Sequence, residues 1–306
     1  MKKKVLITGS NGLLGQKLIS LLREDPNYVV IATARGTNRF PDYNGYLYKS
    51  MDVCNRDEVA SVVEELKPDY IVHTAAMTNV DQCETDRDNC WQLNVRSVEY
   101  LVEACRVNNV HFIHLSTDFI FDGKNGPYKE DDLAEPVSFY GDSKLAAERT
   151  IMKSTIKWAI LRTVLVYGIV NDMSRSNIIL WVKKSLEDGK QITVVNDQWR
   201  TPTLAEDLAM GCMLSMKNNA RGIYNISGKD FLSPLEMAYK TADYFGLNKA
   251  LITPGDSSTF KQPAQRPPKT GFIIDKAQKD LGYNPHSFEE GINIVASQLK
   301  ELEALV

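Results

Sequence analysis

The sequence predicts an α/β fold: a doubly wound parallel sheet with helices on both faces, followed by a smaller C-terminal α/β domain. Two observations support this. Short apolar runs alternate with stretches of helical spacing up to about residue 167, and the first run leads directly into a glycine-rich turn. Strands that alternate with helices form such sheets because their crossover connections are right-handed.

The predicted strands are short, apolar and rich in β-branched or aromatic residues, at 5–7, 29–32, 46–48, 70–73, 112–115 and 159–161. Helical spacing appears at 57–66, about 86–108, 142–153, and later near 175–187, 233–245 and 287–303. From about residue 168 helices mix with Gly- and Pro-rich loops. We therefore predict a first domain of residues 1–167 plus about 196–220. Residues 168–195 and 221–306 are predicted to form a lid over the carboxyl ends of the strands, where ligands bind in this fold class.

Composition excludes several classes of protein. The 306 residues carry a net charge of −3, which argues against a nucleic-acid or anionic-membrane surface, and no apolar run approaches the length of a membrane span. The five cysteines are odd in number and show no C-x-x-C or metal-ligand pattern. We expect a cytoplasmic protein with reduced thiols and no metal, nucleic-acid or membrane partner.

The glycine-rich turn, Thr8 to Gly15, joins the first strand to the first helix. Gly9 permits a tight turn, Gly12 lets backbone N–H groups approach a diphosphate, and Gly15 lets the helix pack closely on the strand. The helix then points its free N–H groups at the phosphates. This context predicts a dinucleotide site of the Rossmann type, and a merely tight turn is the alternative. The turn residues expected to bind are Gly9, Asn11, Gly12, Leu13 and Gly15.

The end of the second strand bears on the choice of cofactor. Where an NAD site carries a carboxylate, this chain has Arg35, and the first carboxylate is Asp42. A guanidinium suits a 2′-phosphate, so NADP(H) is favoured and NAD(H) stays possible. A solvated Arg35, with Arg39 as the phosphate ligand, is the alternative. Asp52, followed by Val53, could accept a hydrogen bond from the adenine amine or simply cap a helix.

Tyr140 and Lys144 are four residues apart on a predicted helix and therefore project from one face. A free tyrosine is a poor acid near neutrality, and the positive charge of Lys144 would lower its pKa and hold a ribose. The hydroxyls of Ser116 and Thr117 follow the fifth strand, where a substrate should lie. Local backbone capping is the alternative for both hydroxyls.

These motifs resemble the extended short-chain dehydrogenases/reductases and, within them, the dTDP-4-dehydrorhamnose reductase family. They occur in the family's order across nearly the whole chain. The matching residues are Thr8-Gly9-x-x-Gly12-x-x-Gly15, Ala75-Ala76-Met77-Thr78-Asn79-Val80-Asp81-x-x-Glu84, Ser116-Thr117-Asp118-Phe119-Ile120-Phe121-Asp122-Gly123, Tyr140-x-x-x-Lys144-Leu145-x-x-Glu148, Leu161-Arg162-Thr163-x-x-x-Tyr167-Gly168, Asp197-Gln198-x-x-x-Pro202-Thr203 and Arg266-Pro267.

The resemblance implies NADPH-dependent reduction of the 4-keto group of a 4-keto-6-deoxy sugar nucleotide, giving dTDP-L-rhamnose in the type member. It implies that Thr117 and Asp118 face the sugar, that Tyr140 protonates the C4 oxygen, and that Lys144 supports Tyr140 and the ribose. The residues implied to line the dinucleotide are the glycine turn, Asp52, Val53, Ala75, Ala76 and Thr78.

Four positions depart from the family pattern. Phe119 replaces a tyrosine, Leu165 an aromatic residue and Arg200 a glycine. We expect all three near the substrate, with Arg200 making a new polar contact. Gln16 does not match the family's acidic, metal-mediated dimer contact, so a monomer and a homodimer both remain open.

Two other classes of function fit the same motifs. One is a non-catalytic NADP-binding regulatory subunit like that of methionine adenosyltransferase, which can keep the Tyr-x-x-x-Lys pattern and has leucine where this chain has Leu165. The other is a sugar-nucleotide epimerase. Net NADPH consumption, binding without turnover, and tightly retained NAD would distinguish the three.

Overall fold

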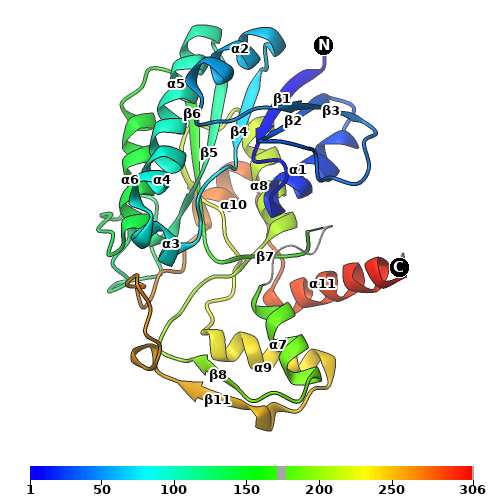
Figure 1. The fold of residues 1–306 in the computed structure, drawn as a ribbon, viewed down its shortest axis with the longest axis vertical. Helices are drawn as coiled ribbons and strands as arrows, with labels where there is room; N and C mark the ends of the chain where they lie inside the picture. Colours follow the sequence, from blue (N-terminus) through cyan, green and yellow to red (C-terminus); the bar gives the residue numbers. More distant parts are fainter. Residues whose placement is uncertain (171–176, 305–306) are drawn as a thin grey trace.

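The structure, a computed structural model, describes residues 1–170 and 177–304. Its centre is a parallel sheet of seven strands, which occupies the upper half of Figure 1. From one edge to the other the strands are β10 (Gly222–Asn225), β6 (Lys157–Thr163), β5 (His111–Thr117), β4 (Tyr70–His73), β1 (Lys3–Thr8), β2 (Tyr28–Ala34) and β3 (Tyr46–Ser50).

The strand order reverses at β1, which pairs with β2 on one side and with β4 on the other. Val5 lies opposite Val30 in β2 and opposite Tyr70 in β4. The chain runs outward from β1 through β2 to β3 and then returns to β4 on the other side of β1, so a crevice opens beyond the carboxyl ends of β1 and β4. The glycine turn, which follows β1, lies at this crevice.

Helices cover both faces of the sheet, as predicted. On one face lie α1 (Leu13–Arg23), α8 (Ala205–Lys217) and α10 (Asp275–Leu281), and on the other α2 (Arg56–Leu66), α5 (Ser97–Asn108) and α6 (Phe139–Met152). Helical spacing explains the packing of α1, because Leu18, Ile19 and Leu22 are all fully buried against the sheet. Each face has its own apolar core.

The helical stretch predicted from about 86 to 108 is divided in the structure. α3 (Val80–Thr85) and α4 (Arg87–Trp91) lead into a π-helical turn, η1 (Gln92–Arg96), and then into α5. Wider turns of this kind occur often at functional sites. Here the turn directs Asn94 inward, where its side chain is 1% exposed.

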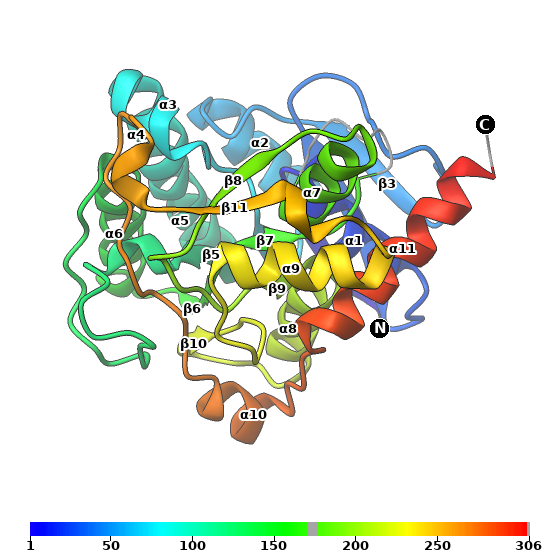
Figure 2. The same cartoon turned by 90° about the horizontal axis from the view of Figure 1, so that it is seen from below.

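Most of the remaining elements lie below the sheet, in and beside the region that the sequence predicted as a lid (Figures 1 and 2). Two small parallel pairs are present, β7 (Val166–Tyr167) with β9 (Thr203–Leu204) and β8 (Ile192–Val195) with β11 (Ile252–Gly255). The helices are α7 (Ile178–Glu187), α9 (Pro234–Phe245) and α11 (Phe288–Glu303), with single turns η3 (Lys249–Leu251) and η4 (Ser257–Thr259). Two apolar clusters hold these helices together.

Two sequence-based assignments need correction. Residues 222–225 and 275–281 were expected in the lid, but the first form β10, which pairs with β6 at the edge of the main sheet, and the second form α10, which packs on that sheet. A four-residue strand after a positive-φ glycine gives almost no periodic signal. Helix α8 was not recognised, although its region was placed in the first domain. The expected helix start near 175 lies outside the described residues.

Two absences hold for the described part of the chain. None of its helices is long and apolar enough to cross a membrane. Within residues 1–170 and 177–304, no three His, Cys, Asp or Glu side chains are grouped so as to hold a metal ion.

Candidate active site

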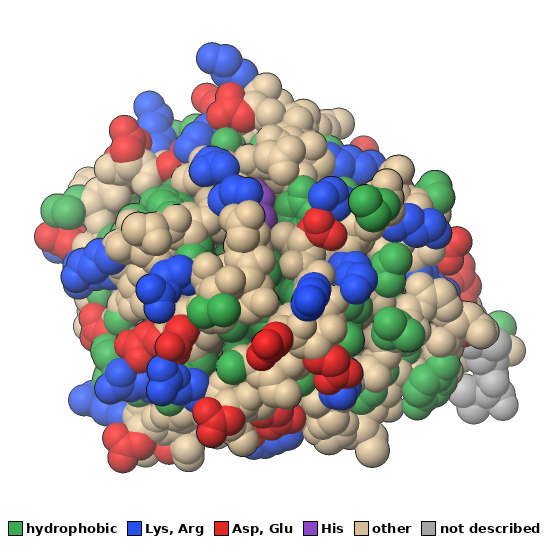
Figure 3. All heavy atoms as spheres, turned by 90° about the horizontal axis from the view of Figure 1, so that it is seen from above, with side chains coloured by type: hydrophobic (Ala, Val, Ile, Leu, Met, Phe, Trp, Pro, Cys, Tyr) green, Lys and Arg blue, Asp and Glu red, His purple; other side chains and the backbone are tan. Residues whose placement is uncertain are grey.

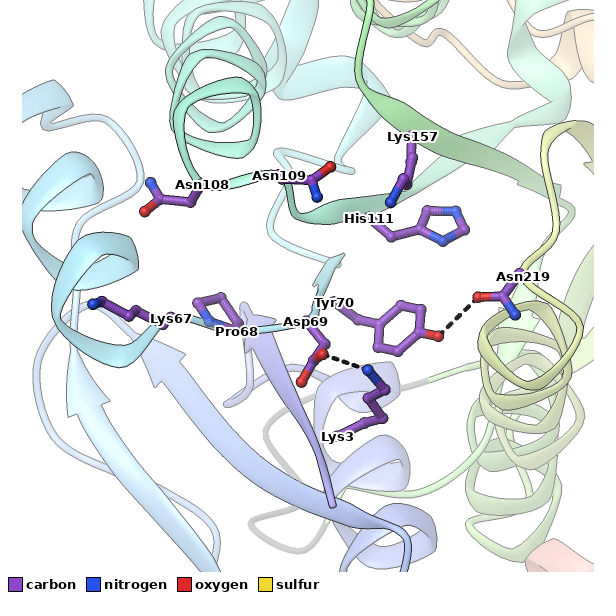
Figure 4. Close-up of a pocket in the computed structure, with 10 residues that line it drawn as sticks. All are labelled: Lys3, Lys67, Pro68, Asp69, Tyr70, Asn108, Asn109, His111, Lys157 and Asn219. Carbon is purple, nitrogen blue, oxygen red and sulfur yellow. Dashed lines mark hydrogen bonds and ion pairs between the residues drawn. The ribbon is translucent and has the colours of Figure 1, made fainter. Parts of the chain in front are cut away.

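The sheet has a hollow at each end of its strands: one at the amino edge, where the strands begin, and one at the carboxyl edge, where they end. The hollow at the amino ends of the strands measures about 620 Å³, and Figure 3 shows it as a small depression surrounded by Lys and Arg side chains. In Figure 4, Lys3 forms an ion pair with Asp69 (Nζ to Oδ1 2.8 Å), and the Tyr70 hydroxyl donates to Asn219. Helices α2 and α5 end here, and their exposed carbonyls make the edge partly negative. The lysines complement these helix ends.

The cleft at the carboxyl ends is larger, about 1120 Å³, and runs from the glycine turn to the lid. It brings together nearly all the predicted site residues. Those that line it are Gly9, Asn11, Gly12, Leu13, Arg35, Asp52, Val53, Ala75, Ala76, Thr78, Thr117, Asp118, Phe119, Tyr140, Lys144 and Leu165. Of the predicted set, Gly15 and Arg200 do not line it.

The glycine turn is closed by a bond from the Gly12 N–H to the Gly9 carbonyl (2.9 Å). Gly9 has φ +66°, and a Cβ there would come within 2.7 Å of the Ala75 nitrogen. A Cβ on Gly15 would come within 2.5 Å of the Gly9 carbonyl oxygen, so Gly15 packs α1 against the turn. Only glycine fits these two positions.

Helix α1 begins at Leu13 with no side-chain cap on its first N–H groups, so they face the cleft with the positive end of the helix dipole. This is an anion site in its chemistry. The neighbouring loop is tied to the turn by Asn11, whose side chain donates to Thr37 O (2.9 Å) and accepts from Arg39 N (2.9 Å). Arg35 and Arg39 both line the same end of the cleft, and Arg35 is exposed.

Asp52 lines the cleft beyond this loop. One of its carboxylate oxygens accepts from the Cys54 N–H (2.9 Å), whereas the N-cap of α2 is Asn55. Asp52 is therefore not the capping residue of that helix. Val53 supplies an apolar neighbour of Asp52 in the cleft wall.

Tyr140 lies in the first turn of α6 and is 8% exposed. Ser143 and Asn94 fix this turn, since Asn94 Nδ2 donates to Ser143 Oγ (3.0 Å) and Ser143 Oγ donates to Tyr140 O (2.7 Å). Burial raises the pKa of Tyr140 above its usual value, and the hydrogen bond with the Thr117 hydroxyl opposes the rise. The direction is opposite to the expected lowering by Lys144, and it keeps Tyr140 protonated.

Lys144, one turn along α6, is 3% exposed and lines the cleft. Its Nζ donates to Leu115 O (2.7 Å) and lies 3.2 Å from His114 Nε2. Burial lowers the pKa of Lys144 to about 8, and the charge of Glu148 opposes this. Lys144 is therefore a cation whose charge responds to pH close to neutrality.

Asp118 and Arg200 form a buried pair. Asp118 is 2% exposed and accepts from Thr117 and Thr270, and Arg200 Nε lies 3.6 Å from its Oδ2. Burial raises the pKa of Asp118, and Arg200 opposes the rise. The Arg200 Nη atoms donate to three backbone carbonyls, those of Trp199, Pro267 and Pro268. Arg200 was expected on the surface of the cleft, but it lies behind that surface. Its N–H groups are used in hydrogen bonds to the loops that form the cleft wall.

Phe119 and Leu165 present apolar surface. The Phe119 ring packs edge-on against Tyr140 with centroids 5.7 Å apart. Leu165 has φ +37° and is 44% exposed, although left-handed backbone is costly for a leucine. Strain of this kind persists where the surrounding structure enforces it, often at ligand sites. Here Thr203 fixes the backbone around Leu165, because its hydroxyl donates to the Val164 carbonyl and its N–H donates to the Leu165 carbonyl.

Sequence reasoning assigned no role to three residues of this region. His114 contacts Lys144, His73 lines the cleft, and Arg266 joins the lid to α3 through Asp81 (Nη2 to Oδ2 2.7 Å). The sequence could have revealed the two histidines, because each places a polar ring in an apolar strand: His73 ends β4 and His114 lies within β5. The ion pair spans 185 residues, so no local pattern reveals it.

Comparison with known proteins gives the family. The sequence model of the RmlD substrate binding domain matches residues 2–301. The chain is similar to the dTDP-4-dehydrorhamnose reductase of Aggregatibacter actinomycetemcomitans, with 30% identity over 94% of this chain and 97% of that protein. It is also similar to methionine adenosyltransferase 2 subunit beta of Danio rerio, with 31% identity over 87% of this chain and 81% of that protein.

Among solved structures, the fold is similar to that of dTDP-4-dehydrorhamnose reductase from Bacillus anthracis in complex with NADP. The TM-score is 0.83 at 27% identity, over 97% of this chain and 100% of that chain. The family match spans nearly the whole sequence, and the sheet, the glycine turn and the Tyr-x-x-x-Lys helix agree with it. This chain therefore belongs to the RmlD substrate binding domain family of extended short-chain dehydrogenases/reductases.

Proposed function

We propose that this protein uses NADPH to reduce the 4-keto group of a 4-keto-6-deoxy sugar nucleotide, in the manner of a dTDP-4-dehydrorhamnose reductase. The observation that carries the proposal is the arrangement at the inner end of the cleft. There Tyr140, Thr117 and Lys144 together line one wall of the cleft. The glycine turn lies at the other end of the same cleft.

The residues fit NADP(H). The tight glycine turn, in which Gly9 has φ +66° and packs against the Ala75 backbone, and the uncapped start of α1 suit the diphosphate. We assign Arg35 to the 2′-phosphate and Asp52 with Val53 to the adenine. Ala75, Ala76 and Thr78 line the middle of the dinucleotide, and Lys144 holds the nicotinamide ribose. When bound, the cofactor supplies a hydride to the keto carbon.

The chain's own groups handle the proton and the charge. Negative charge grows on the carbonyl oxygen as the carbon is reduced, and a donor within hydrogen-bond reach must neutralise it. Tyr140 is assigned as that donor, and its raised pKa keeps the proton available until then. Thr117 orients the carbonyl, and the Lys144 charge stabilises the phenolate that remains.

On the substrate side, we propose that Asp118, Phe119 and Leu165 face the sugar. Arg200 acts on them indirectly, through Asp118 and the loop carbonyls it binds. We further propose that residues 1–167 and about 196–220, together with β10 and α10, form the cofactor domain, and that the lid closes on the sugar nucleotide. We also propose a cytoplasmic location, with which the five free cysteines accord, and we expect a monomer or homodimer with no nucleic-acid or membrane partner.

A second candidate is a regulatory subunit that binds NADP without turnover. Similarity to methionine adenosyltransferase 2 subunit beta favours it, and so does the exposed Leu165 where the reductase family has an aromatic residue. A sugar-nucleotide epimerase is a third candidate, with the same cleft and a retained NAD.

One assay separates these candidates. Purified protein is mixed with NADPH and a panel of 4-keto-6-deoxy sugar nucleotides that differ in base and stereochemistry, and absorbance at the NADPH band is followed. Substrate-dependent NADPH loss with one member supports the reductase. Tight NADPH binding without turnover across the panel contradicts it and supports the regulatory subunit. Co-purified NAD, with interconversion of sugar epimers and no net oxidation, supports the epimerase.

A further inference from the structure

The Lys144 ammonium is held from beneath by two neighbouring residues of β5. Nζ donates to the Leu115 carbonyl at 2.7 Å and lies 3.2 Å from His114 Nε2. Both Lys144 and His114 are buried, at 3% and 0% exposure. An ammonium group has three N–H donors, so one remains for the cleft that Lys144 lines.

The contact fixes the tautomer of His114. An ammonium has no lone pair, so Nε2 must be the acceptor and the imidazole proton sits on Nδ1. Nδ1 is buried and has no hydrogen-bond partner among the described residues. Burial lowers the pKa of His114 well below its usual value, and the charges of Lys144 and His73 lower it further. His114 therefore stays neutral and remains an acceptor throughout the working pH range.

The surroundings of Lys144 offer little other support. From β4, the His73 ring stacks on His114 with centroids 5.4 Å apart, and burial lowers its pKa to about 3, so it is neutral too. Glu148, on the same helix, is in a bidentate ion pair with Arg162 (2.8 and 3.0 Å). The other titratable groups facing this region are Tyr140 on α6 and Cys90 on α4.

We propose that His114 is a positioning residue of this site, whose Nε2 keeps the Lys144 ammonium charged and directs its third N–H into the cleft. The inference rests on the proposed function, which assigns Lys144 to the ribose and to Tyr140. Burial lowers the pKa of Lys144 to about 8, so that the neutral amine competes with the charged ammonium near neutral pH. Each acceptor therefore decides how much of the cation survives near neutral pH.

The experiment compares four forms of the full chain: wild type, His114→Phe, His114→Gln and His111→Phe. Phenylalanine keeps a ring packed against those of Phe112 and His73 and removes the acceptor, whereas glutamine offers an oxygen near the position of Nε2. His111 lies on the same strand, is also buried, and contacts Tyr70 at the opposite edge. Its variant is the matched control for placing phenylalanine in β5. His114→Leu replaces His114→Phe if the latter does not fold.

The first readout is the titration of Lys144 in the cofactor-free protein, followed by NMR of ¹³Cε-labelled lysine and assigned with Lys144→Met. His114→Phe should lower the titration midpoint by about 1–2 pH units, the size expected for one hydrogen bond to a buried charge. In His114→Gln the midpoint should return most of the way to the wild-type value, and in His111→Phe it should equal the wild-type value. Equal midpoints in wild type and His114→Phe, or equal shifts in both His114 variants, would overturn the proposal.

The second readout is NADPH affinity against pH. Lys144 is charged below its midpoint, so the loss of affinity at high pH should begin about 1–2 pH units earlier in His114→Phe. The two proposals fail separately. A shifted Lys144 midpoint in a protein that reduces no keto sugar leaves the role of His114 standing and removes the reductase. An active reductase in which His114→Phe leaves the Lys144 midpoint unmoved supports the reductase and removes the role of His114.

Discussion

At the amino edge of the sheet α2 and α5 end, whereas at the carboxyl edge α1 and α6 begin. The amino edge therefore collects helix carbonyls and the lysines that complement them, and its ion pair between Lys3 and Asp69 is satisfied internally. The carboxyl edge collects free N–H groups, a glycine turn and buried titratable groups. The direction of the helices in a parallel α/β sheet thus decides which edge can bind a phosphate-rich ligand.

The two edges also use left-handed backbone differently. At the amino edge Lys67 and Asn109 have φ +46° and +53°, and each is the C-cap of a helix. At the carboxyl edge Leu165 has φ +37° and ends no helix. The first two satisfy carbonyls that helix ends leave free, and the third directs a side chain into the cleft.

The largest expected effect comes from removing one hydroxyl at the carboxyl edge. Tyr140→Phe should lower the rate of keto-sugar reduction about 10²–10⁴-fold, the range for a lost general acid, while NADPH affinity is retained. Tyr70→Phe removes a hydroxyl at the amino edge, where it bonds to Met216 and Asn219. That variant should keep the wild-type rate. Equal losses in both would show that Tyr140 acts only through folding, and steady-state kinetics decide it.

Arg35→Ala should weaken NADPH binding by about 1.5–3 kcal/mol, roughly 10- to 100-fold, because one charge-assisted contact to the 2′-phosphate is lost. NADH affinity should barely change. Lys157→Ala removes a positive charge at the amino edge and should leave both affinities as they are. Fluorescence titration of both cofactors measures this. Parallel losses of NADPH and NADH in Arg35→Ala would mean that the residue shapes the loop instead.

Replacing Leu165 and Lys67, which both have left-handed backbone, by glycine should distinguish backbone strain from a role in substrate binding. Leu165→Gly and Lys67→Gly should each raise the free energy of unfolding by about 1 kcal/mol, since glycine adopts φ > 0 without steric cost. Only Leu165→Gly should also raise the KM for the sugar nucleotide. Denaturant unfolding and kinetics test both effects. An unchanged KM in Leu165→Gly would remove Leu165 from the substrate wall.

The smallest effect is expected at the amino-edge ion pair. Lys3→Met should lower the Tm only slightly near neutral pH, because the pair is partly exposed. Burial raises the pKa of Asp69 in the folded state, but the hydrogen bonds from Lys3 and the Lys4 N–H, with the charges of both lysines, outweigh it and lower that pKa overall. Such a carboxylate adds stability above its unfolded pKa and loses it as pH falls. Wild type and Lys3→Met should therefore converge in acid, and a Tm gap that persists there would contradict this.

Local patterns predicted what is local. The glycine turn joins adjacent elements, and Tyr140 and Lys144 share one helix, so their spacing and their position after predicted strands marked them as candidates. Contacts between distant segments were different. Arg200 was expected on the cleft surface, but its position depends on carbonyls 67 and 68 residues away, which no periodicity encodes. Strand β10 was missed for the same reason, since only its pairing with β6 defines it.

The return of the chain to the sheet at β10 has a consequence for synthesis. β6 is complete at residue 163, but its outer edge has no partner until residues 222–225 are made. Its sequence, KWAILRT, is largely apolar, and an unpaired apolar strand edge is a template for association between chains. As the chain leaves the ribosome, this edge is exposed for the time needed to translate about sixty residues. The nascent chain is therefore most vulnerable to aggregation when the glycine turn and the helix of Tyr140 are already made but α8 and β10 are not.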